Sequence, residues 1–209
     1  MANIISLSRI LLVFIAALLL YFKASCYAYS ASFILTVLAF SLDGLDGYVA
    51  RKFHEESKLG SVLDIMGDRI SEYVYWIMCA HLLWVPVIFP IIAVTRGVIT
   101  DSIRSIAMER GLIAFGKGSM LNDSVNQWLC GSKPMKIGYA VAKAVAFSLF
   151  ILAYNPAMPK CAAWCTLIIA AVSAEIAILL CVLRGIPVVL ESKKFFVKEN
   201  VEESKLDEQ

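Results

Sequence analysis

The chain has 209 residues, of which 60% are hydrophobic and only 17% are charged. This composition is typical of a polytopic membrane protein and excludes an ordinary soluble domain. The formal net charge of +2 is too small to suggest a nucleic-acid partner, so we expect none. Apolar runs of membrane-spanning length recur along the chain, and they predict an all-α protein with six transmembrane helices.

The first predicted helix spans residues 4–22, which is long enough to cross a bilayer. No basic segment precedes it and Arg9 interrupts its apolar run, so we expect a retained helix rather than a cleaved signal peptide. Asn3, Ser6 and Arg9 recur every three residues and therefore share one face of the helix start. Either polar residues at a helix interface or part of a binding site would give this pattern.

The second and third predicted helices, residues 31–51 and 60–85, carry four aspartates near the short charged link between them. The four are Asp43, Asp46, Asp64 and Asp68. The first two are three residues apart and the last two are four apart, so the carboxylates of each pair lie on one face of a helix. Two helix ends that face each other across a short link can bring all four carboxylates together.

These carboxylates predict a site for divalent cations. An ionised aspartate at the centre of a membrane helix costs about 3 kcal/mol on insertion scales, so four of them need counter-charge. Mg²⁺ and Mn²⁺ prefer carboxylate oxygens, whereas the alternative is pairing with nearby lysines and arginines. Gly47 and Gly60 leave bare backbone that a ligand can approach, and the planar guanidinium of Arg51 suits phosphate. We therefore expect a phosphate group held by metal at the membrane surface.

The fourth predicted helix covers residues 87–110 and carries two arginines. Arg96 and Arg104 are eight residues apart, close to two turns, so they share one face. An arginine deep in an apolar run, such as Arg96, is a functional candidate by default. Its expected partner is Asp101 or an acid of the central set, and a purely structural pair with Asp101 is the alternative.

A long polar connection, residues 111–135, precedes the last two predicted helices at 137–154 and 161–183. Such a connection either covers a site or is a solvated loop whose lysines mark the inner side of the membrane. Lys143 and Glu175 lie within the last two helices and could pair across the bundle.

Basic residues set the expected orientation. With six helices both termini lie on one side, and placing them inside puts nearly every basic residue of the connections inside as well. These residues are Arg51, Lys52, Lys58, Arg104, Arg110, Lys117, Lys133, Lys136, Arg184 and the lysines of the tail. Only Lys23 and Lys160 fall in outside links, so we expect cytoplasmic termini and aspartates that face the cytoplasm. Residues 1–190 are expected to form one membrane domain, and residues 191–209 a charged cytoplasmic tail.

The region of the four aspartates resembles the CDP-alcohol phosphotransferase (CDP-alcohol phosphatidyltransferase) family. The family signature is D-x2-D-G-x2-A-R-x8-G-x3-D-x3-D, and every fixed position is present at the family spacing. The matching residues are Asp43, Asp46, Gly47, Ala50, Arg51, Gly60, Asp64 and Asp68. The family also carries N-x-x-T-x-x-R near its start, where this chain has Asn3, Ser6 and Arg9, and Ser6 keeps the hydroxyl.

The resemblance implies an enzyme of the cytoplasmic membrane that moves a phosphatidyl group from CDP-diacylglycerol to an alcohol and releases CMP. It implies two divalent cations, Mg²⁺ or Mn²⁺, held by the four aspartates, with Asp68 also acting as the general base. Contacts with the nucleotide lipid are implied for Ser6, Arg9, Gly47, Ala50, Arg51, Ser57 and Gly60. Members of the family are commonly homodimers, so a homodimer is expected here.

The fourth helix resembles the phosphatidylglycerophosphate synthase branch, which carries R-x7-R-x6-G. Arg96, Arg104 and Gly111 match this pattern, and Lys133 and Lys136 are a loose counterpart of a basic run in the branch. The resemblance makes glycerol 3-phosphate the expected acceptor. Its phosphate would be bound by the two arginines and the two lysines.

Two departures leave other acceptors open. Gly97 stands where the branch usually has Glu, and the central motif lacks the branch's D-P-x-x-D-K. The run from Asp68 to Ser71 looks more like phosphatidylinositol phosphate synthases, so inositol phosphate is the alternative acceptor. Phosphatidylglycerol, as in a cardiolipin synthase, is a third. From another class of protein, a divalent-cation transporter would also carry aspartates, although here they lie at one end of two helices beside Arg51.

Overall fold

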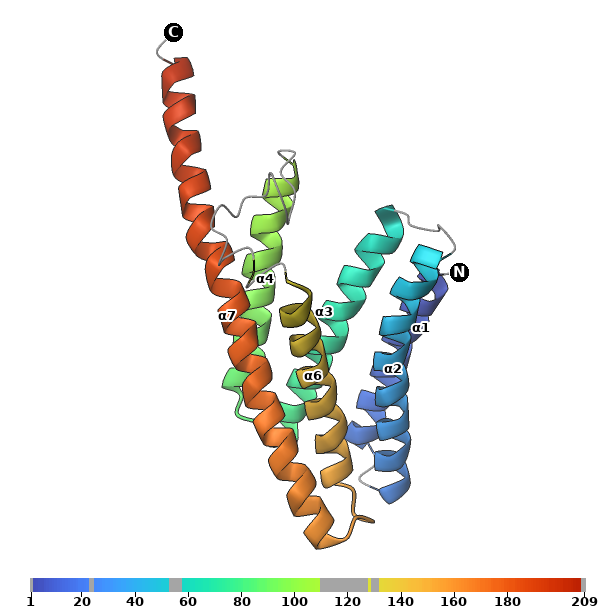
Figure 1. Cartoon of the computed structure of the whole chain (residues 1–209). Helices are drawn as coiled ribbons and strands as arrows, with labels where there is room; N and C mark the ends of the chain where they lie inside the picture. Colours follow the sequence, from blue (N-terminus) through green and yellow to red (C-terminus); the bar gives the residue numbers. More distant parts are fainter. Residues whose placement is uncertain (1, 23–24, 53–57, 110–127, 129–131, 208–209) are drawn as a thin grey trace. The chain divides into compact units, whose positions relative to one another are not determined.

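The computed structural model describes residues 2–22, 25–52, 58–109, 128 and 132–207, and all regular structure in these ranges is helical (Figure 1). Side chains are described for residues 6–22, 25–44, 60, 62–106, 128, 132, 134–190 and 192. The long helices are α1 (Ala2–Phe22), α2 (Cys26–Lys52), α3 (Lys58–His81), α4 (Ile88–Glu109), α6 (Lys133–Ala153) and α7 (Lys160–Asp207). The all-helical prediction is confirmed.

Each predicted helix overlaps an observed one, but α2 begins at Cys26 rather than at residue 31, and α3 ends at His81 rather than at residue 85. The end predicted at Leu183 is wrong, because α7 continues through Pro187 to Asp207. The sequence beyond Arg184 is rich in Glu and Lys, and both residues favour helix although they are charged. The boundary between a membrane domain and a tail at residue 190 therefore stays a prediction.

Within the part of the chain that the structure describes, three helices contain stretches long and apolar enough to cross a membrane. These stretches are Cys26–Gly44, Pro134–Ala153 and Lys160–Leu190, and α1 contains a shorter apolar stretch, Ser6–Phe22. The acidic and basic side chains of α3 and α4 lower the hydropathy of those two helices. The structure thus supports a membrane protein, while six crossings and the side of the termini stay predictions.

Two compact units share the chain. The first consists of Met1–Ile91 and Val141–Ile176, and the second of Ile92–Ala140 and Ala177–Gln209. The four aspartates belong to the first unit, and Arg96 and Arg104 belong to the second.

Aromatic packing around α3 forms the core of the first unit. The hydroxyl of Tyr75 on α3 donates a 2.8 Å hydrogen bond to Oγ1 of Thr36 on α2. The ring of Phe147 on α6 lies against both Tyr75 and Trp76, with centroid distances of 5.2 and 4.7 Å. Tyr75, Trp76 and Phe147 are buried. These contacts join α2, α3 and α6 and fix the rotation of α3 about its axis.

The end of α3 away from the aspartates is closed by a Schellman motif. Leu83 adopts a left-handed backbone conformation, with φ at 60°. Its N–H donates to the carbonyl of Ala80 at 3.1 Å, and the N–H of Trp84 donates to the carbonyl of Cys79 at 2.8 Å. The ring of Trp84 then stacks on Tyr154 with centroids 4.9 Å apart. The helix that carries half of the candidate site is thus held along its length.

Candidate active site

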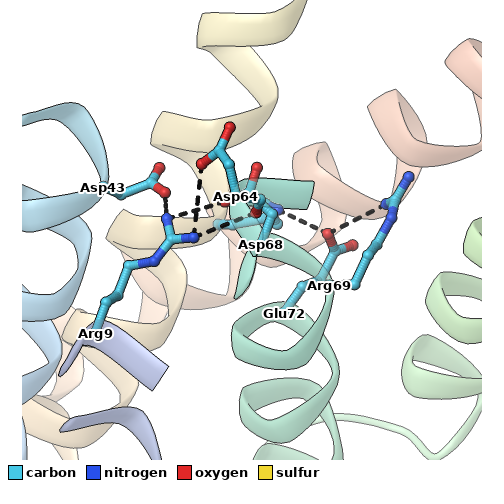
Figure 2. A network of polar contacts seen from close by, with 7 residues as sticks. Arg9, Asp43, Asp64, Asp68, Arg69 and Glu72 are labelled. Carbon is cyan, nitrogen blue, oxygen red and sulfur yellow. Dashed lines mark hydrogen bonds and ion pairs between the residues drawn. The ribbon is translucent and has the colours of Figure 1, made fainter. Parts of the chain in front are cut away.

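Three carboxylates from two helices converge in the first unit. Asp43 comes from α2, and Asp64 and Asp68 come from α3. Each offers an oxygen atom, and these atoms all lie within 4.8 Å of one another (Figure 2). The convergence predicted from the helical spacing is confirmed for these three residues. The fourth, Asp46, lies in α2, but its side chain is outside the described part of the structure.

The guanidinium of Arg9, from α1, lies among the three carboxylates (Figure 2). Its Nη1 donates a 3.1 Å hydrogen bond to Oδ1 of Asp68 and forms an ion pair with Asp43. Its Nη2 donates a 3.4 Å bond to the backbone carbonyl of Asp64 and lies 3.8 Å from the carboxylate of that residue. The side chain of Arg9 is only 2% exposed. Sequence spacing placed Arg9 on a polar face of α1 but did not predict these partners.

Gly67 makes the space that the guanidinium occupies. A Cβ built on Gly67 would overlap Nη2 of Arg9 and would lie 3.3 Å from its Cζ. Any side chain at this position would therefore force the guanidinium to shift. Gly67 falls at a variable position of the family signature, so no motif points to it.

The donor atoms of the cluster fit a divalent cation. Among the described side chains, one guanidinium faces three carboxylates, so these four groups together carry an excess of negative charge. The side chains of Asp64 and Asp68 are 53% and 54% exposed, and that of Asp43 is 34% exposed. Accessible carboxylate oxygens at this mutual separation suit the oxygen preference of Mg²⁺ and Mn²⁺. The number and identity of the ions stay predictions.

A second group of charges lies one turn further along α3. Glu72, whose side chain is 2% exposed, accepts a 2.7 Å hydrogen bond from Nζ of Lys143 on α6. Nη1 of Arg69 lies 3.8 Å from the same carboxylate oxygen (Figure 2). The predicted pairing of Lys143 with Glu175 is wrong, because the packing of α6 on α3 brings Lys143 to Glu72 and leaves Glu175 exposed.

Of the residues predicted to contact the nucleotide lipid, Ser6 and Arg9 are the best described. Ser6 is buried on α1, one turn before Arg9. Gly60 lies at the start of α3, while Gly47, Ala50 and Arg51 lie in α2 with side chains outside the described set, and Ser57 lies outside the described residues. Their nucleotide contacts therefore stay predictions.

In the second unit, Arg96 on α4 packs against the backbone of α7. A Cβ built on Gly185 would lie 2.8 Å from Cγ and 3.3 Å from Nε of Arg96. Nε and Nη2 of Arg96 are buried and have no hydrogen-bond partner among the described residues. Asp101 lies 3.8 Å from Nη1 of Arg104, so the expected pairing of Asp101 with Arg96 is wrong. Residues three apart on a helix meet, whereas residues five apart point in different directions.

The other predicted acceptor residues are the two lysines of α6. Lys133 begins α6 with its side chain outside the described set, and Lys136 lies one turn later. Arg184, which was not predicted as a site residue, lies over the ring of Tyr139 with 5.4 Å from Cζ to the ring centroid. Arg184 directly precedes Gly185, the glycine that Arg96 contacts.

Comparison with known proteins agrees with the resemblance drawn from the motifs. The family model described as CDP-alcohol phosphatidyltransferase matches residues 1–174. The chain is 35% identical over 71 residues to a CDP-diacylglycerol–glycerol-3-phosphate 3-phosphatidyltransferase of Aquifex aeolicus (strain VF5), covering 34% of this chain and 38% of the relative. It is 37% identical over 70 residues to CDP-diacylglycerol–inositol 3-phosphatidyltransferase 1 of Arabidopsis thaliana, covering 33% and 28%.

The matched segments span well under half of the length of either curated relative. The family model, by contrast, covers α1 to α6 and part of α7, including all eight signature positions and the carboxylate cluster. The chain therefore belongs to the CDP-alcohol phosphatidyltransferase family of membrane transferases.

Proposed function

We propose that the chain transfers the phosphatidyl group of CDP-diacylglycerol to glycerol 3-phosphate and releases CMP. The observation that carries the proposal is the convergence of Asp43, Asp64 and Asp68, with Arg9 among them, in a chain of this family. The proposal includes two divalent cations held by these aspartates and Asp46, cytoplasmic termini, a site that faces the cytoplasm, and a homodimer.

The donor's diphosphate is anionic, so three carboxylates alone would repel it. Divalent cations, when bound, neutralise charge on the diphosphate and on the departing CMP. Arg9 can also donate two parallel hydrogen bonds to a phosphate. We assign the remaining nucleotide contacts to Ser6, Gly47, Ala50, Arg51, Ser57 and Gly60.

Asp68 accepts the proton of the acceptor hydroxyl in the proposed reaction. The acceptor oxygen forms a bond to the lipid-side phosphorus, and the bond from that phosphorus to the CMP oxygen breaks, with the electron pair leaving on CMP. The side chain of Asp68 is 54% exposed, so an acceptor can reach it. A positioned general base of this kind contributes typically 10² to 10⁴-fold to the rate.

A phosphorylated acceptor requires a cationic pocket, which we place in the second unit. Arg96, Arg104, Lys133 and Lys136 are the proposed phosphate ligands, and Arg184 joins them because it precedes Gly185, which Arg96 contacts. Buried guanidinium nitrogens without a partner among the described residues, as on Arg96, favour an anionic acceptor over an uncharged alcohol. The Aquifex relative is named for glycerol 3-phosphate and the Arabidopsis relative for inositol, so inositol phosphate is the second candidate.

Two further alternatives have less support. Phosphatidylglycerol as the acceptor would need a less cationic pocket than five basic residues provide. A cation transporter would need acidic residues along a path, whereas the three described aspartates of α2 and α3 gather in one cluster.

The test is CMP release by purified protein in detergent with CDP-diacylglycerol and Mg²⁺ or Mn²⁺. Glycerol 3-phosphate, inositol phosphate, free inositol and phosphatidylglycerol are supplied in parallel, and Asp68→Asn is the control. We expect release with glycerol 3-phosphate that is lost in the control. Release with another acceptor would correct the product, and cation flux through vesicles without CMP release would favour the transporter.

A further inference from the structure

We propose that Arg9 is a built-in counter-cation that competes with divalent cations for the aspartate cluster, and that Gly67 admits it. The inference rests on the proposed metal site. It adds a role for two residues in controlling when that site is filled.

Because Arg9 contacts all three aspartates, its guanidinium and a metal ion cannot easily occupy the cluster at the same time. Its Nη1 contacts both Asp43 and Asp68, and its Nη2 lies near Asp64. The same three aspartates each offer one carboxylate oxygen to a cation, and these oxygens lie within 4.8 Å of one another. A guanidinium and a metal ion repel each other and cannot both use these oxygens, so binding of the cation requires Arg9 to withdraw.

The cluster does not satisfy every hydrogen-bond donor of the Arg9 side chain. Its Nε is buried and has no hydrogen-bond partner among the described residues. A buried donor without a partner is costly, and a phosphate that accepts from Nε and an Nη group would satisfy it. The diphosphate of the donor lipid offers such oxygens. Arg9 would then pass from the carboxylates to the diphosphate, so the nucleotide lipid and the metal would strengthen each other's binding.

Gly67 allows this competition to be tested without removing the charge of Arg9. An alanine methyl at position 67 would overlap Nη2, so Gly67→Ala displaces the guanidinium while keeping it in the protein. Gly44 provides a matched control, because it also lies on a helix beside a cluster aspartate and a Cβ there meets nothing within 4 Å. Both changes replace a helical glycine by alanine, which itself favours the helix.

The experiment measures Mn²⁺ binding to the detergent-solubilised protein by titration calorimetry and by the electron paramagnetic resonance signal of free Mn²⁺. Without CDP-diacylglycerol, we expect Gly67→Ala and Arg9→Gln to bind Mn²⁺ about tenfold more tightly than the natural chain, within the usual range of coupling between sites. Gly44→Ala should not change the affinity. Adding Gly67→Ala to Arg9→Gln should not change the affinity further, because the guanidinium that the alanine methyl would displace is already absent.

Saturating CDP-diacylglycerol should raise the affinity of the natural chain for Mn²⁺ more than that of Gly67→Ala. If folded Gly67→Ala binds Mn²⁺ as the natural chain does, or if its effect persists in the Arg9→Gln background, the competition is refuted and the metal site stands. If Gly67→Ala does not fold, unchanged affinity in Arg9→Gln refutes it. If the natural chain binds no Mn²⁺ that depends on Asp64 and Asp68, the proposed function fails as well.

Discussion

Two groups of charged side chains are centred one turn apart on α3. They differ in solvent exposure and in how far their positive and negative charges balance. The open cluster consists of Asp43, Asp64, Asp68 and Arg9, and its two α3 carboxylates are about half exposed. The closed pair consists of Glu72, which is buried, and Lys143, which is half-buried; they are joined at 2.7 Å, and Arg69 lies 3.8 Å from the same carboxylate. The open cluster has more carboxylates than cations, whereas the closed pair brings its own counter-charge.

Because of this difference, we expect the open cluster to bind ligands and the closed pair to stabilise the fold. An accessible carboxylate in an acid-rich cluster can bind a ligand. Its conversion to an amide removes one negative charge and leaves no unpaired charge in the protein interior. A buried ion pair cannot lose one partner without leaving an uncompensated charge in the protein interior. Changes in the open cluster should therefore alter activity, and changes in the closed pair should alter folding.

The largest effect is expected from Asp68→Asn in the open cluster. Loss of the proposed general base should lower the rate of CMP release about 10² to 10⁴-fold. The amide keeps the shape of the side chain at a half-exposed site, so the thermal unfolding temperature should stay close to that of the natural chain. Initial rates and thermal unfolding in the same detergent check both parts. Undiminished release would contradict the assignment of Asp68.

Lys143→Met should break the closed pair and destabilise the protein. Removal of one partner from a buried ion pair costs about 3–5 kcal/mol, and because Arg69 still lies 3.8 Å from Glu72 we expect about 3 kcal/mol here, which denaturant or thermal unfolding can detect. The double variant Glu72→Gln with Lys143→Met removes both charges and should recover most of the loss. If Lys143→Met were as stable as the natural chain, the ion pair would not contribute to folding.

The arginines of the second unit should affect the acceptor but not the metal. Arg96→Lys keeps the charge and loses the planar fork, so we expect the KM for glycerol 3-phosphate to rise about tenfold. The affinity for Mn²⁺ should not change, because Arg96 is not in the open cluster. Steady-state kinetics and Mn²⁺ titration distinguish the two effects, and an unchanged KM would remove Arg96 from the acceptor pocket.

The smallest effect is expected at the hydrogen bond that Tyr75, about one turn after Glu72 on α3, donates to Thr36. Tyr75→Phe removes one buried hydrogen bond between α2 and α3 and should lower the free energy of unfolding by about 1 kcal/mol. Thr36 keeps its 2.7 Å bond to the carbonyl of Ser32, so the site should stay intact. Activity per folded molecule is the check, and a large loss would mean that this contact also positions the aspartates.

The sequence predicted what depends on local periodicity. Asp64 and Asp68 are one turn apart on any helix, so their shared face followed from spacing alone. The partners of Arg9 and Lys143 did not follow, because Arg9 and Asp68 are 59 residues apart and Lys143 and Glu72 are 71 apart. Such pairings depend on how helices pack. The role of Gly67 is still less visible, since it is defined by the space that another helix's side chain fills.

The most direct test of the proposed function is a measurement of phosphatidyl transfer. Purified protein is given CDP-diacylglycerol, Mg²⁺ and glycerol 3-phosphate, and both CMP and the product lipid are quantified by mass spectrometry. We predict phosphatidylglycerol phosphate and CMP in equal amounts, lost in Asp68→Asn and retained in the folded double variant of Glu72 and Lys143. Absence of the product from folded protein, or CMP release that does not depend on Asp68, would contradict the account.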